Sequence, residues 1–146
     1  MKEIHYKDIF TDIIMGIFNF LKKNKEQHGL SYASFEMWLD NTLHREIPND
    51  VEAFCFNIYE DADKNWSLEL VGASSFDEED SDWACDEVFT TRNNPFRWHE
   101  DSEWTQIQEE AQNVVKKYLD QGLFCQKLKQ SKGIAIGFVE GDLVLL

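Results

Sequence analysis

The residues best suited to do chemistry lie in and near an acidic run between Asp77 and Glu87. Carboxylates at this density repel one another, by about 0.2–1 kcal/mol for each close exposed pair. A cationic partner would relieve that repulsion, so we expect this stretch to bind one; a solvated loop without a partner is the alternative reading. The candidate partner-binding residues are Asp77, Glu78, Glu79, Asp80, Asp82, Trp83, Asp86, Glu87 and Trp98.

Four of the five tryptophans fall between residues 51 and 110. Trp83 interrupts the acidic run and Trp98 follows a segment rich in Asn and Pro. Aromatic anchors ringed by charge are typical of protein interfaces, so both are candidate anchors, with core packing as the alternative. Trp66 and Trp104 follow the apolar periodicity of their segments. We expect those two to fill the core.

Asp77, Asp80 and Asp82 are the most plausible metal ligands and give a second alternative, a metal-dependent enzyme. An EF-hand calcium loop needs D-x-[DN]-x-[DN]-G and a distal Glu, and this spacing does not occur. Neither do G-x-S-x-G, Walker A, H-E-x-x-H or C-x-x-C, and the four histidines are scattered. The acidic neighbours of Cys85 disfavour a thiolate nucleophile. We therefore expect a non-enzymatic protein with no metal ion and no cofactor.

The net charge is concentrated in the middle of the chain. Residues 51–110 hold 17 of the 28 acidic residues and only three basic ones, a balance of −14 that equals the net charge of the whole chain. Folding of this stretch would create one anionic surface that attracts a basic protein. The same charge argues against nucleic acid and against anionic membranes as partners. The oligomeric state is left open.

The bulk composition fits one globular domain over residues 1–146, since 42% of the residues are hydrophobic. The longest apolar stretch, Ile9–Leu21, is too short and too polar for a membrane span. The first residues do not resemble a signal peptide. Three cysteines without a paired spacing indicate reduced thiols, so we expect a cytoplasmic protein.

The elements that must position these residues follow from the apolar periodicity. A period of 3.6 predicts helices over Tyr6–Asn24, over Tyr32–Arg45 with Ser31 or Ser34 as cap, and from Asp101 or Ser102 to a stop at Gly122. A period of two predicts strands over Val51–Tyr59, Trp66–Ala73, Trp83–Thr91, Gly133–Val139 and Leu143–Leu146. Residues 76–82 and 92–100 are predicted loops. The expected fold is α+β, with an antiparallel sheet of about five strands packed against three helices in the order α-α-β-β-β-α-β-β.

Two segments carry a resemblance to a known class of proteins: LVGASSFDEEDSDWACDEVF (Leu70–Phe89) and GIAIGFVEGDLVLL (Gly133–Leu146). In these segments, and in size, acidity and element order, the chain resembles the small immunity proteins of bacterial polymorphic-toxin and contact-dependent inhibition systems. The resemblance implies a cytoplasmic antidote that binds a cognate toxin domain, frequently a basic nuclease, and blocks its active site. An acidic regulatory or housekeeping domain is the alternative.

Overall fold

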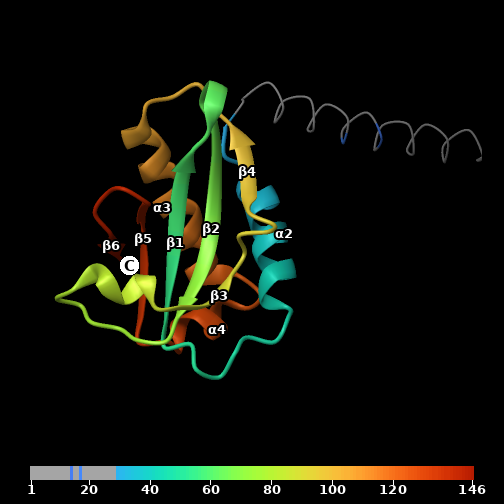
Figure 1. Ribbon diagram of the computed structural model, residues 1–146. Helices are drawn as coiled ribbons and strands as arrows, with labels where there is room; N and C mark the ends of the chain where they lie inside the picture. Colours follow the sequence, from blue (N-terminus) through green and yellow to red (C-terminus); the bar gives the residue numbers. More distant parts are fainter. Residues whose placement is uncertain (1–13, 15–16, 18–28) are drawn as a thin grey trace, which may run out of the picture.

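The computed structural model describes Ile14, Ile17 and residues 29–146, and it shows an α+β fold in which helices cover one face of a sheet (Figure 1). The predicted helix Tyr6–Asn24 lies outside the described residues except for Ile14 and Ile17. In the view of Figure 1 the sheet faces the reader, and the helices lie behind it. The described strands are β1 (Ala53–Glu60), β2 (Asn65–Ala73), β3 (Glu87–Thr90), β4 (Phe96–His99), β5 (Gly133–Phe138) and β6 (Val144–Leu145).

The sheet is mixed rather than antiparallel. Its strand order is β3-β2-β1-β5-β6, and β4 also pairs with β2. The two predicted hairpins, β1–β2 and β5–β6, are confirmed as antiparallel pairs. They join through β1 and β5, which run parallel, with Ala53 opposite Gly133 and Ile58 opposite Phe138. Parallel neighbours need a crossover, and the helical segment before β5 supplies it.

The outer edge of β2 is shared by two short strands. β3 pairs with the Val71–Ala73 end of β2, and β4 pairs with the Asn65–Leu68 end. The prediction of a loop over residues 92–100 is therefore wrong at Phe96–His99. The predicted third strand is shorter than expected, because its first part forms the 3-10 helix η2 (Ser81–Cys85).

Three helices are described: α2 (Tyr32–Leu43), α3 (Trp104–Gln121) and α4 (Cys125–Lys129). Ser31 caps α2, because its hydroxyl accepts a hydrogen bond from the Ser34 backbone N–H at 3.3 Å. The N-cap of α3 is Glu103, which makes no side-chain cap, so the prediction of Asp101 or Ser102 is wrong. The short helix α4 was not predicted.

Gly122 ends α3, as predicted, but for a different reason than a left-handed stop. Its φ is −68°, which any residue can adopt. A Cβ atom at this position would lie 2.6 Å from the ring of Tyr118. The Tyr118 hydroxyl donates to Asp40 Oδ1 at 2.7 Å and so links α3 to α2. Glycine is needed here because the ring packs directly against the backbone.

The sheet separates two apolar clusters, as the period of two predicts. Phe54, Phe56 and Ile58 of β1 face the helices and join the main core with Trp66 and Leu70 of β2. The alternate residues point to the other face. There a smaller cluster contains Ala53, Cys55, Val71, Ala73, Trp83 and Ala135.

Candidate functional site

The acidic run lies mainly in the connection between β2 and β3, on the face of the sheet opposite α2, α3 and α4. Trp83 anchors this connection: its side chain is 4% exposed, and its ring meets Phe76 edge-on at 5.2 Å. Both residues pack with the small side chains of β1, β2 and β5. The connection is thus fixed to the sheet by an apolar contact (Figure 1, yellow-green). We call residues 77–82 the acidic loop.

The five carboxylates of the acidic loop are exposed: Asp77, Glu78, Glu79, Asp80 and Asp82. Two of them shape the loop, because Asp77 Oδ1 accepts from the Glu79 N–H at 2.9 Å and Asp80 Oδ1 accepts from the Asp82 N–H at 3.0 Å. Among the described residues, none of the five forms an ion pair within 4 Å. Their negative charges therefore face the solvent together.

The other two predicted carboxylates, Asp86 and Glu87, make hydrogen bonds to other residues of this protein. The Asp86 side chain accepts from the Ser75 hydroxyl at 2.5 Å, and its backbone carbonyl accepts from the Ser74 N–H at 2.9 Å. Glu87 accepts two hydrogen bonds from Arg92 Nη2, at 2.9 and 3.0 Å. The negative charge of Glu87 is therefore compensated by Arg92. Asp86 links the end of the connection to its beginning, at Ser74 and Ser75.

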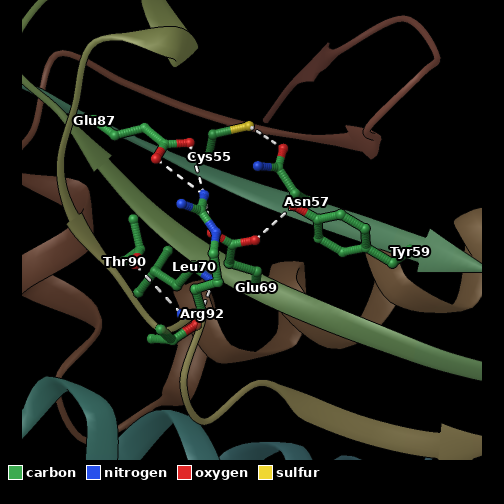
Figure 2. A network of polar contacts seen from close by, with 9 residues as sticks. Cys55, Asn57, Tyr59, Glu69, Leu70, Glu87, Thr90 and Arg92 are labelled. Atoms are coloured by element: carbon green, nitrogen blue, oxygen red, sulfur yellow. Dashed lines mark hydrogen bonds and ion pairs between the residues drawn. The ribbon is translucent and has the colours of Figure 1, made fainter.

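Figure 2 shows a polar network beside this connection that sequence reasoning missed. Its centre is Glu69 of β2, which is 2% exposed. Arg92 Nη2 donates to Glu69 Oε1 at 2.8 Å, and the Tyr59 hydroxyl donates to Oε2 at 2.7 Å. Arg92 thus bridges Glu69 and Glu87, so it compensates a buried carboxylate that would otherwise be costly. The signal in the sequence was Glu69 itself, the only charged residue of β2, between Leu68 and Leu70.

Two groups of this network are held neutral. Burial and the hydrogen bond to Glu69 raise the pKa of Tyr59 to about 12. Burial, followed by the negative charge of Glu69, raises the pKa of the Cys55 thiol to about 12, and Cys55 Sγ lies 3.2 Å from Asn57 Oδ1. A thiol with such a pKa is no nucleophile at neutral pH. The network is suited to holding the sheet and the loop connection together.

The tryptophans are arranged differently from the prediction. Trp98 lies on β4, is 9% exposed and stacks on Phe96 at 5.6 Å within the main core. Trp83 is buried as well, so the rings of both predicted anchors are engaged in the protein's own packing. Trp66 is in the core as predicted. Trp104, predicted to be in the core, is 56% exposed because it begins α3 and projects from its first turn.

The acidic residues do not form one surface. In the β1–β2 hairpin, Ala53 pairs with Ala73 at one end and Glu60 pairs with Trp66 at the other. The acidic loop follows the first end, whereas Glu60 and Asp61 lie at the turn. A strand of eight residues separates the two groups by about 25 Å. The prediction of a single anionic surface is therefore wrong, because the acidic loop and the acids of the turn lie at opposite ends of the hairpin.

Within the described residues, no group of three or more His, Cys, Asp or Glu side chains is placed to hold a metal ion. Asp77, Asp80 and Asp82 do not converge in this way. None of the helices in this part of the chain combines the length and the apolar character that a bilayer crossing needs. Comparison of the chain with protein families, with curated proteins and with solved structures finds no significant match.

Proposed function

We propose that this protein is a non-enzymatic, cytoplasmic binding protein that neutralises a basic partner, and that it acts as a bacterial immunity protein against a cognate toxin domain. The observation that carries this proposal is the acidic loop, with five exposed carboxylates and no compensating ion pair among the described residues. Trp83 packs on the sheet and Arg92 binds Glu87, and both contacts hold the connection between β2 and β3 in place. A charged loop that is ordered before binding loses less conformational freedom when a partner docks.

The charge of the loop suits the speed that an antidote needs. Complementary charge accelerates association, up to about 10⁸–10⁹ M⁻¹s⁻¹ at low salt. Association driven in this way weakens as salt screens the charges, over a Debye length of about 8 Å at physiological ionic strength. We therefore expect the association rate with the toxin to fall steeply as salt is added.

The test is a charge-reversal variant of the acidic loop, assayed by co-expression with a candidate toxin domain and by binding kinetics. Glu78, Glu79 and Asp82 are chosen for replacement by Lys, because their carboxylates accept none of the loop's hydrogen bonds. Affinity should fall by roughly a hundredfold, mostly through slower association, and rescue from the toxin should be lost.

The matched control reverses three exposed acids that do not belong to the loop: Glu46, Glu109 and Asp120. It changes the net charge of the protein by the same amount. If the control weakens binding as much as the loop variant does, overall charge and not the loop attracts the partner. If neither variant changes affinity or rescue, the proposed role of the loop is refuted.

A further inference from the structure

A groove opens at the end of the sheet opposite the acidic loop. Its walls are the last residues of β1, the first turn of α3 and the turn between β5 and β6, and its volume is about 780 Å³. The apolar part of the lining comes from Ile58, Trp104, Phe138, Val139 and Val144. Three of these side chains are large and exposed: Trp104 at 56%, Val139 at 49% and Val144 at 37%. An exposed apolar groove of this kind is a frequent feature of interaction sites.

Trp104 is fixed in the groove by a chain of aromatic contacts. Its ring meets Phe138 edge-on, with centroids 6.1 Å apart and planes at 84°. Phe138 in turn meets Trp66 at 6.1 Å, and Trp66 is 1% exposed. The exposed indole is therefore supported from the core. A tryptophan ordered in advance, with much of its surface still open to solvent, is the kind of residue that dominates binding energy at interfaces.

The charge around the groove is of one sign. Glu60, Glu140 and Asp142 line it and are exposed. Among the described residues that line it there is no lysine or arginine. An anionic segment would be repelled by this rim. A cationic segment would enter at a small cost in desolvation free energy, because its charges would meet carboxylates. Its apolar side chains would cover Trp104 and Val139.

We propose that this groove binds a cationic segment of a partner protein, one that carries Lys or Arg next to an aromatic or aliphatic side chain. Trp104 is the apolar anchor of the contact, and Glu140 and Asp142 on the β5–β6 turn, with Glu60, select for positive charge. The proposal rests on the proposed function, since both require a basic partner. It adds a second contact surface at the far end of the β1–β2 hairpin from the acidic loop.

The experiment uses a displayed library of random twelve-residue peptides, selected on the full-length protein at low salt. We expect the enriched peptides to combine positive charge with an aromatic or aliphatic residue. One enriched peptide is then titrated into protein labelled with 5-fluorotryptophan, and the ¹⁹F resonance of Trp104 is assigned with Trp104→Phe. This resonance should move on binding, whereas the buried Trp66 should change little.

Three variants locate the binding site. Trp104→Ala should lower the affinity for the selected peptide by about tenfold or more. The double variant Glu140→Gln/Asp142→Asn should lower this affinity as well and reduce its dependence on salt. Leu123→Ala is the matched control, because Leu123 is 74% exposed outside the groove. Its affinity should equal that of the unmodified protein. Thermal unfolding confirms that each variant is folded.

The other outcomes either overturn the groove proposal or separate it from the proposed function of the loop. Enriched peptides that lack positive charge, or no enrichment, would overturn the groove proposal directly. If cationic peptides bind without moving the Trp104 resonance and lose binding when the acidic loop is reversed, the proposed function stands and the groove fails. If the groove variants abolish binding and the loop variant does not, the groove stands without the loop. A Trp104 resonance that moves with protein concentration alone would instead show a second copy of the chain in the groove.

Discussion

Glu110 of α3 should make the stability of this protein depend on pH. Its Oε1 accepts from Gln106 Nε2 at 3.1 Å, while its Oε2 is buried and receives no hydrogen bond from an N–H or O–H group of the described residues. Burial, and the hydrogen bond that protonated Glu110 makes to Glu100, raise the pKa of Glu110 to about 7. Glu100 is itself 6% exposed and accepts the Leu30 N–H at 3.2 Å. Two carboxyl groups in this position favour sharing one proton.

The sign of the effect follows from proton linkage. Between pH 4.5 and about 7 the folded protein holds a proton on Glu110 that the unfolded chain has released. The free energy of unfolding that comes from this group is fully present below pH 4.5 and is lost as pH rises through about 7. Each pH unit between the folded and unfolded pKa is worth about 1.4 kcal/mol, which sets an upper bound of about 3–4 kcal/mol. Solvent that reaches the partly exposed side chain reduces this to roughly 1–2 kcal/mol.

The perturbation is Glu110→Gln, which cannot ionise and retains a donor toward Glu100. We expect this variant to unfold at higher urea concentration than the unmodified protein at pH 8, by roughly 1–2 kcal/mol, and to lose that advantage near pH 4.5. The assay is urea unfolding at half-unit steps of pH, followed by circular dichroism. Glu109→Gln is the matched control on the exposed side of the same turn. The reasoning is refuted if the difference between Glu110→Gln and the unmodified protein is the same at pH 4.5 and pH 8.

Three further substitutions test the packing described above. Arg92→Met should destabilise the protein by about 3 kcal/mol in urea unfolding, because the buried carboxylate of Glu69 loses its countercharge; adding Glu69→Gln should recover much of the loss, and no recovery would contradict the role of the ion pair. Trp83→Ala should cost about 3–5 kcal/mol and make the acidic loop sensitive to a glutamate-specific protease, whereas an unchanged cleavage rate would show that the ring does not anchor it. Gly122→Ala should cost about 1–3 kcal/mol, since the new methyl group meets the ring of Tyr118; a neutral result in thermal unfolding would show that the helix end can relax.

The sequence predicted the local parts of the fold well. Alternation at Phe54, Phe56 and Ile58 identified β1 and the face it buries, and the pair Glu140–Gly141 identified the β5–β6 turn. The parallel pairing of β1 with β5 was not predictable in this way, because it joins residues 80 positions apart and leaves no local pattern. The strand β4 was missed since Pro95 and the preceding asparagines indicate a turn. That turn exists, closed by a hydrogen bond from the Asn94 N–H to the Thr91 carbonyl, but the chain extends again at once and β4 begins at Phe96.

The candidate site was predictable as a segment but not as a surface. Burial of Trp83 under the acidic loop depends on small residues from three strands, and no periodicity in the loop itself reveals it. Arg92 compensates the charge of Glu87 while it also binds Glu69 on the neighbouring strand, a placement that only the folded sheet creates. Trp104 fits the apolar spacing of α3, yet it stands at the first helical position, where it contacts Phe138 of β5 and still leaves 56% of its surface exposed. Charge counting along the chain could not show that the hairpin separates the acids into two groups.

The side-by-side placement of β1 and β5 also governs how this chain can assemble. The contact between Ala53 and Gly133 closes a long loop, which slows folding relative to a protein built from neighbouring segments. Until β5 has been synthesised, β1 is an open edge whose backbone can pair with another chain. Nascent or cleaved chains that lack β5 are therefore the species most prone to aggregate, and that risk ends when β5 pairs with β1.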